Sequence, residues 1–145
     1  MPTRTARTAW NGDLQEGSGQ VELSSSKVGT YEVSFPKRAA DDADGTTSPE
    51  ELIAAAHSSC FAMSLSNEIG KAGGTPNALE ITAEVTLGQK DGGPHITKVA
   101  LTVRGEVEGV DAAGFEKAAQ AAKAGCPVSK ALGGVDEITV DAALE

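Results

Sequence analysis

The chain has 145 residues, a formal net charge of −9 and two cysteines. This length predicts one domain spanning residues 1–145, large enough to bury a core. The negative charge, with no cluster of lysines and arginines and no aromatic stacking surface, argues against nucleic acid and against a membrane surface as partners. The first residues, MPTRTARTAW, lack the apolar core of a secretory signal, so we expect a cytoplasmic protein.

Three short strands are predicted at the start of the chain. Residues 3–10 alternate weakly in hydropathy and are followed by turn residues, and residues 19–24 and 30–35 form two further predicted strands around a serine-rich turn. The polar segment 37–47 (KRAADDADGTT) is predicted to be a loop. Loops of this length are often functional, so its single arginine, Arg38, is a candidate site residue.

The following stretch, residues 48–71, predicts one long helix. Ser48 suits the N-cap, Pro49 suits the first helical position, and Glu51 completes a capping box in which its side chain turns back to the cap. This arrangement leaves the neighbouring Glu50 without a structural role. Glu50 is therefore a candidate for chemistry.

The interior of this helix carries no charged side chain from Leu52 to Leu65, and its apolar residues cover the whole circumference. Such a helix is predicted to be buried on all sides. A membrane span needs about 20 apolar residues, and this run is shorter and contains polar residues, so no span is expected. Because the chain has only three Phe, one Trp and one Tyr, we expect a second subunit to cover one face of the helix.

The second half of the chain begins with a predicted antiparallel hairpin. Residues 71–77 are rich in helix-breaking residues, and residues 79–87 then alternate between apolar and polar side chains. A DGGP turn connects this strand to a second strand at residues 96–108.

A second helix over residues 112–124 is predicted after the hairpin, with Asp111 as its cap and Gly125 at its end. Cys126 then suits the N-cap of a short helix that starts at Pro127, and residues 138–144 form a final strand. Strands and helices occur in blocks, which indicates an α+β fold with a mainly antiparallel sheet.

The two cysteines are the strongest candidates for chemistry, because in the cytoplasm a cysteine pair is more often catalytic or redox-active than structural. Cys126 at a helix start has backbone N–H groups that favour a thiolate and lower its pKa. Burial alone would raise the pKa of Cys60 unless a cation is brought to it. By this local rule Cys126 is the more reactive thiol. The candidate cation is Arg38, with Arg4, Arg7 and Arg104 as alternatives.

His57 lies three residues before Cys60, hence on the same helical face, which permits a Cys–His pair or two metal ligands. A metal site would need a further ligand, and His95 and Cys126 show no grouping typical of one. We therefore expect a core histidine with its hydrogen bonds satisfied, and neither a metal nor another cofactor.

Two motifs carry a specific resemblance. The stretch GTTSPEELIAAAHSSCFAMSLS at residues 45–66, followed by KAGCPVSKAL at residues 123–132, closely resembles the OsmC/Ohr family of thiol-dependent organic hydroperoxide reductases, its OsmC branch in particular. The resemblance runs nearly end to end. It implies an OsmC-like fold with about six strands in a mainly antiparallel sheet, packed on a long central helix with one or two further helices, in an intertwined homodimer.

The resemblance also implies roles for four residues. Cys60 would attack the peroxide and Cys126 would resolve the sulfenic acid as a disulfide, which overrules the local ranking of the two thiols. Glu50 and Arg38 correspond to the glutamate and the OsmC-branch arginine that activate the attacking cysteine. In the Ohr branch the arginine lies much earlier, where this chain has residues 17–19, Gly-Ser-Gly. The implied partners are an organic hydroperoxide and an external dithiol, of the lipoyl type.

Two other functions remain open at the level of the sequence. A hydrolase or acyltransferase could use Cys60 with His57 and would not need Cys126. A non-enzymatic stress or ligand-binding protein could contain Cys60 as an inert buried thiol.

Overall fold

The computed structural model describes all 145 residues, and the chain forms two compact units, Met1–Leu52 and Ile53–Glu145. Helices and strands occur together in blocks, as the α+β prediction requires. The predicted single sheet is wrong, because the six strands form two separate three-stranded sheets. None of the helices is both long and apolar enough to cross a membrane. That the whole chain acts as one domain stays a prediction.

The first unit contains an antiparallel sheet of three strands, β1 (Arg7–Asn11), β2 (Ser18–Glu22) and β3 (Thr30–Val33), with β2 in the middle. β1 starts at Arg7, later than the predicted residue 3. Gly19 of β2 pairs with Trp10 of β1, and a Cβ atom at Gly19 would lie 2.5 Å from the Ala9 carbonyl oxygen and 2.9 Å from the Trp10 ring. Only glycine allows this close approach of the two strands.

A short helix, α1 (Phe35–Ala39), follows β3 where the sequence predicts the end of a strand and then a loop. The Ser34 hydroxyl accepts a hydrogen bond from the Lys37 N–H at 3.4 Å, and Pro36 occupies the first turn. A serine cap with proline behind it is a helix start. Pro36 therefore begins a helix here rather than only ending a strand, and Arg38 lies on that helix.

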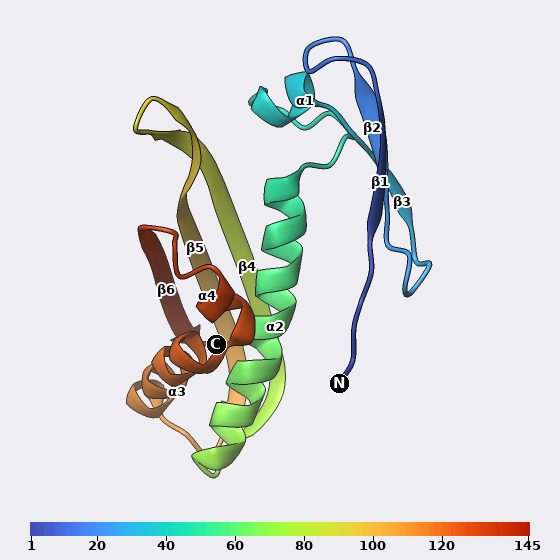
Figure 1. Cartoon of the computed structure of the whole chain (residues 1–145). Helices are drawn as coiled ribbons and strands as arrows, with labels where there is room; N and C mark the ends of the chain where they lie inside the picture. The colour runs from blue at the N-terminus through green and yellow to red at the C-terminus, as the bar shows by residue number, and fades with distance from the viewer. The chain divides into compact units, whose positions relative to one another are not determined.

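The second unit contains the other sheet, made of β4 (Thr75–Lys90), β5 (Gly93–Glu108) and β6 (Glu137–Leu144). β4 and β5 form the predicted hairpin, which is longer than the pattern indicates because Thr75 and Pro76 already pair with β5. The last strand, β6, pairs with β5 in parallel, from Lys98 with Glu137 to Gly105 with Leu144. Figure 1 shows the three strands side by side.

Three helices complete the fold: α2 (Pro49–Lys71), α3 (Ala112–Gly125) and α4 (Pro127–Ala131). In the second unit α2 and α3 cover one face of the β4–β5–β6 sheet (Figure 1). Their shared core contains Phe61, Leu65 and Ile69 from α2 and Phe115 from α3, against Leu101 and neighbouring residues of the sheet. Gly105 of β5 lies under Phe115, since a Cβ there would be 2.9 Å from the ring.

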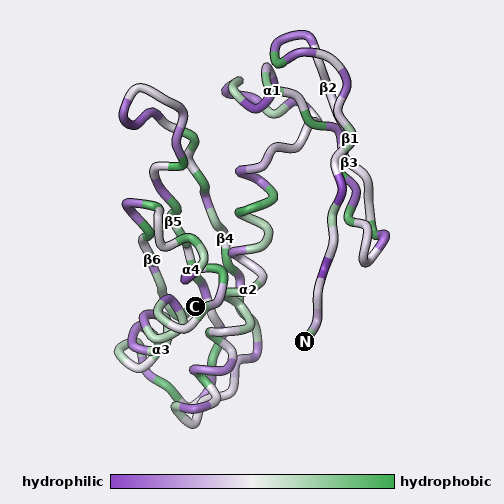
Figure 2. The backbone as a smooth tube through the Cα atoms, viewed as in Figure 1, coloured by the Kyte–Doolittle hydropathy of each residue, from purple (hydrophilic) through white to green (hydrophobic).

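Within the single chain the long helix α2 is buried along one stripe only, and burial of its other side by a second subunit stays a prediction. His57, Phe61, Leu65 and Ile69 recur every fourth residue and are fully buried, whereas Met63 is 73% exposed. Figure 2 shows hydrophobic residues at intervals along α2 and alternating hydrophilic and hydrophobic residues along α3. The physical reason is that the sheet and α3 cover one side of α2 and nothing else in the second unit covers the other.

Candidate active site

The first candidate cluster joins Arg38 of α1 to Glu50 in the first turn of α2. The Arg38 Nε lies 3.0 and 3.1 Å from the two Glu50 carboxylate oxygens, and Nη2 lies 2.7 Å from one of them. Glu50 is 7% exposed and the Arg38 side chain 33% exposed. The hydrogen bonds and charge of Glu50 raise the pKa of Arg38 further, against a smaller opposing effect of burial. Glu50 thus holds the Arg38 guanidinium in a fixed position, and the arginine side chain stays partly exposed to solvent.

The helix start beside this pair matches the predicted cap in part. The Ser48 hydroxyl accepts a hydrogen bond from the Glu51 N–H at 3.1 Å, as the capping box requires. The Glu51 carboxylate, however, accepts from the Thr47 hydroxyl rather than turning back to the cap. Glu51 is occupied with the preceding turn, and Glu50 is the acid that meets Arg38.

The other arginines do not take part in this cluster. Arg4 donates to the carbonyl of Thr3, and Arg7 is exposed on β1. Arg104 of β5 lies 3.4 Å from the exposed Asp141 carboxylate on β6. Arg38 is the arginine that the structure joins to Glu50.

The second candidate cluster brings the two cysteines together, although they are 66 residues apart in the chain. Cys60 lies on the middle of α2, and Cys126 lies at the junction of α3 and α4, where it is the N-cap of α4. Their sulfur atoms are 3.1 Å apart, and both thiols are free. Cys126 is fully buried and Cys60 is partly exposed. Cys60 is therefore the thiol that solvent or a substrate can reach.

The two thiols differ in their surroundings. Burial raises the pKa of Cys60, and this outweighs the Val128 N–H that favours its thiolate. Burial acts on Cys126 in the same direction, but the N–H of Ser129, the Cys60 thiol and the Ser129 hydroxyl outweigh it and lower the pKa of Cys126. Cys126 thus has the lower pKa of the two thiols, as its position at a helix start predicts from the sequence. Within the second unit, Cys60 has no cation to favour its thiolate.

His57 lies at the centre of a third contact that the sequence did not predict. Its ring is fully buried, and Nε2 lies 2.6 Å from the hydroxyl of Ser129 on α4. The predicted satisfied core histidine is correct for Nε2 only, because Nδ1 has no hydrogen-bond partner. Ser129 was not a candidate in the sequence. Its place three residues after an N-cap cysteine, on the first turn of the same helix, is the signal that could have identified it.

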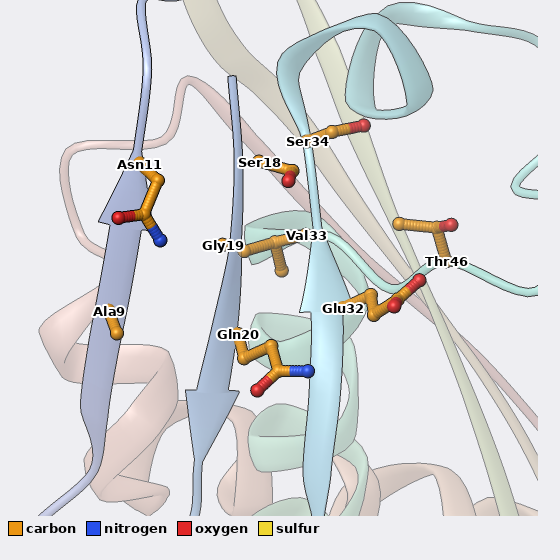
Figure 3. A pocket seen from close by; sticks show the side chains of 9 residues that line it. All are labelled: Ala9, Asn11, Ser18, Gly19, Gln20, Glu32, Val33, Ser34 and Thr46. Carbon is orange, nitrogen blue, oxygen red and sulfur yellow. The ribbon is translucent and has the colours of Figure 1, made fainter.

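Several pockets border the first unit's sheet, and two of them bear on the predicted site residues. One, of about 280 Å³, is lined by Trp10, Leu14, Val33, Phe35 and Pro49 together with Arg38, so it combines an apolar wall with a cation. The other, of about 350 Å³, is polar, and Figure 3 shows side chains of β1, β2 and β3 directed into it. Ser18 and Gly19 line it, and its only charged side chain is Glu32. No arginine lines this pocket or lies at residues 17–19, where the Ohr branch has its arginine.

The sequence-predicted site residues thus form two pairs, Arg38 with Glu50 and Cys60 with Cys126. His57 contacts Ser129 rather than Cys60, and no group of three or more His, Cys, Asp or Glu side chains is close enough to hold a metal ion. A half-buried cation–carboxylate pair and a dithiol that can be oxidised to a disulfide are the parts of a thiol redox site. Their catalytic roles stay predictions.

Comparisons with known proteins agree with this chemistry. The family model "OsmC-like protein" matches residues 41–141. The chain is 44% identical to peroxiredoxin OsmC of Escherichia coli (strain K12) over 132 residues, which cover 91% of this chain and 90% of that protein. It is 31% identical to the organic hydroperoxide resistance protein OhrA of Bacillus subtilis (strain 168), with 83% and 85% of the two chains covered.

A solved structure shows the same fold. An organic hydroperoxide resistance protein from Elizabethkingia anophelis superposes with a TM-score of 0.76 and 28% identity, covering 99% of this chain and 98% of that one. The family match covers well over half of the chain, and it includes both cysteines, Glu50 and the start of the long helix. This chain belongs to the OsmC-like family.

Proposed function

We propose that the protein is a thiol-dependent peroxidase that reduces organic hydroperoxides to alcohols. The observation that carries the proposal is the 3.1 Å approach of the Cys60 and Cys126 sulfur atoms, in a chain whose relatives are named for peroxiredoxin activity and for organic hydroperoxide resistance. An inert buried thiol would need no second cysteine beside it. A Cys60–His57 hydrolase would need the histidine at Cys60, and His57 instead bonds to Ser129.

The proposed cycle has three steps. The Cys60 thiolate attacks the terminal oxygen of the hydroperoxide, the O–O bond breaks, and the alkoxide leaves and takes up a proton as the alcohol. The Cys126 sulfur then attacks the Cys60 sulfenic acid, the S–O bond breaks, water leaves, and a Cys60–Cys126 disulfide forms. An external dithiol, of the lipoyl type by family resemblance, reduces the disulfide through a mixed disulfide. We place this cycle in the cytoplasm, which keeps such dithiols reduced.

The attacking thiolate needs a cation, and we propose that Arg38 supplies it. Burial raises the pKa of Cys60, so little thiolate would form at neutral pH without help. The Glu50 ion pair uses Nε and Nη2 of Arg38, which leaves Nη1 outside the pair and available to a thiolate or to the departing oxygen. Glu50 holds the guanidinium plane in place for this contact.

The apolar pocket beside Arg38 supports the choice of organic over inorganic peroxide. Trp10, Leu14 and Phe35 are among the residues that line it, and its volume of about 280 Å³ suits the organic group of a hydroperoxide whose O–O end lies near the guanidinium. Hydrogen peroxide has no apolar group to occupy it. Alkyl and aryl hydroperoxides should therefore be preferred over hydrogen peroxide.

A homodimer would bring Arg38, Glu50 and Cys60 into one site. The helix α2 is continuous from Pro49 to Lys71, and the ten positions from Glu50 to Cys60 correspond to a rise of about 15 Å, more than an arginine bridging the two side chains can span. The partly uncovered face of α2 supports a second subunit. We propose that Glu50 and Arg38 of one subunit serve Cys60 of the other.

The test of the function is thiol titration of the reduced protein with a stoichiometric organic hydroperoxide, followed by the same reaction in two variants. Both thiols should be lost in the natural protein, with release of the alcohol. Cys60→Ser should abolish peroxide consumption, whereas Cys126→Ser should react once and accumulate sulfenic or overoxidised Cys60, detected by mass spectrometry. Unchanged thiols would support the non-enzymatic or hydrolase alternatives. Turnover in Cys60→Ser, with oxidation first at Cys126, would reverse the two roles.

A further inference from the structure

His57 and Ser129 form a buried pair that has no role in the proposed catalytic cycle as described above. The two side chains connect α2 to α4 through a buried 2.6 Å contact between Nε2 and Oγ. His57 is fully buried and Ser129 is 7% exposed, so no bulk water competes for this hydrogen bond. Ser129 lies in the first turn of the helix that Cys126 caps. The pair therefore adjoins the thiol of Cys126.

The sulfur of Cys126 is influenced by Ser129 in two ways. The Cys126 side chain makes no capping hydrogen bond, and Ser129 follows it by three residues, in the first turn of α4. The backbone N–H and the hydroxyl of Ser129 both favour the charged form of the Cys126 thiol. These contacts, with the Cys60 thiol, overcome burial and lower the pKa of Cys126. A hydroxyl stabilises a thiolate only when its hydrogen points at the sulfur. The group that orients the Ser129 hydroxyl hydrogen therefore decides whether this hydroxyl stabilises the Cys126 thiolate.

The protonation of His57 determines this orientation. Burial lowers the pKa of the imidazole, so the ring is neutral at neutral pH and carries a single N–H. If that proton is on Nδ1, a buried donor is left without a partner and the Ser129 hydrogen is used by Nε2. If the proton is on Nε2, the ring donates to the Ser129 oxygen and the hydroxyl hydrogen is free for the sulfur. Only the second arrangement leaves every nearby donor engaged.

We propose that His57 and Ser129 are positioning residues for disulfide formation, acting as a donor chain from the His57 Nε2–H through the Ser129 hydroxyl to the Cys126 thiolate. The inference rests on the proposed function, because it concerns the second step of that cycle. In this step the Cys126 thiolate attacks the Cys60 sulfenic sulfur, and the S–O bond breaks. The departing hydroxide takes up one proton from solvent at the partly exposed Cys60, in place of the one that Cys126 gave up, and leaves as water. The step therefore needs no further oxidant, reductant or proton donor from the chain.

The first test needs no peroxide. In a Cys60→Ser background, the pH dependence of Cys126 alkylation by a small thiol reagent gives the pKa of Cys126. Ser129→Ala should raise this pKa by about one unit, and Ser129→Thr, which retains the hydroxyl, should restore it. Ser59→Ala, at an exposed serine of α2 whose hydroxyl bonds only to backbone carbonyls, is the matched control and should leave it unchanged.

The second test follows disulfide closure after rapid mixing with an organic hydroperoxide. Ser129→Ala and His57→Leu should each slow closure about tenfold, while formation of the Cys60 sulfenic acid keeps its rate. His57→Gln, whose amide can donate near the position of Nε2, should recover most of the loss. Since the two residues act in series, the double variant should be no slower than either single variant.

Several results would overturn the inference. Multiplicative losses in the double variant would show that the two residues act independently, and failure of His57→Gln to improve on His57→Leu in equally folded proteins would show that Nε2 donates nothing. An unchanged pKa of Cys126 in Ser129→Ala would also refute it. The alkylation test separates this inference from the proposed function, because Cys126 can show the predicted pKa change in a protein that reduces no peroxide.

Discussion

At the scale of single residues, the Arg38–Glu50 pair carries most of the proposed activation. A bidentate guanidinium is held in one plane, in contrast to a lysine ammonium on a flexible stem. Glu50 is almost fully buried, so its charge depends on Arg38 for compensation. The same pair therefore affects both stability and reactivity, and experiments have to separate the two.

Arg38→Ala should raise the pKa of Cys60 and slow its attack on organic hydroperoxide at neutral pH by orders of magnitude. Burial already raises the pKa of Cys60, and removal of the cation that stabilises the thiolate should raise this pKa further. Less of Cys60 is then thiolate at neutral pH, so its attack is slower. Arg38→Lys should rescue poorly because it loses the bidentate contact with Glu50. The measurement is the pH profile of Cys60 oxidation in single-turnover mixing.

The matched control for this prediction is Arg104→Ala, which removes an arginine paired with an exposed carboxylate on the other sheet. It should leave the rate of Cys60 oxidation unchanged. Because Arg38→Ala leaves Glu50 buried without a partner, its unfolding curve should be recorded alongside. Rates like those of the natural protein in a folded Arg38→Ala variant would shift the role to Arg4 or Arg7, and to Arg104 if the Arg104→Ala variant were slowed instead.

At the scale of elements, the start of α2 is the feature that places Glu50. The Ser48 hydroxyl satisfies one of the free N–H groups of the first turn, and the Thr47–Glu51 contact fixes the chain entering the helix. Glu50 follows two residues after the cap, at the end of the helix where a negative charge is favoured. The cap thus positions a site residue as well as starting the helix.

Ser48→Ala should lower the free energy of unfolding by about 1 kcal/mol, the usual cost of losing an N-cap side chain. The measurement is the midpoint of urea unfolding at constant slope. Ser66→Ala, on the exposed side of the same helix, is the control and should change stability by a few tenths of a kcal/mol at most. An equal effect of the two substitutions would mean that the cap contributes nothing to this helix start.

At the scale of the whole molecule, the proposed active site is shared between two subunits. One chain pairs its cysteines and pairs Arg38 with Glu50, while the continuous helix separates Glu50 from Cys60 along its axis. A two-fold dimer would present the Arg38–Glu50 pair of each subunit to the cysteine pair of the other. Such an isologous contact creates two equivalent sites at once.

Mixing tests this arrangement directly. Glu50→Ala and Cys60→Ser should each be inactive alone, and activity should return when their subunits exchange, because the heterodimer has one intact site with Cys60 from the first chain and Glu50 from the second. The readout is peroxide consumption after mild dissociation and reassociation, with the heterodimer fraction measured by native mass spectrometry. Heterodimers that form and stay inactive would mean that each site is built from a single chain.

The sequence by itself determined what depends on near neighbours. The start of α2 at Ser48 and Pro49, the Asp111 cap of α3 and the place of Cys126 before α4 were all predicted, because caps and prolines act within one turn of the backbone. Where a local rule had two solutions, prediction failed: Pro36 could end a strand or begin a helix, and Glu51 could bond to its cap or to Thr47.

The tertiary structure alone decided what depends on distant partners. The 3.1 Å approach of Cys60 and Cys126, the contact of His57 with Ser129, and the parallel pairing of β6 with β5 all join residues far apart in the chain. Hydropathy patterns show that a face is apolar but not what covers it, so α2 was predicted to be buried all round although one chain covers only its stripe from His57 to Ile69. Which faces meet is a property of the packed molecule, because it depends on the shapes of all the elements together.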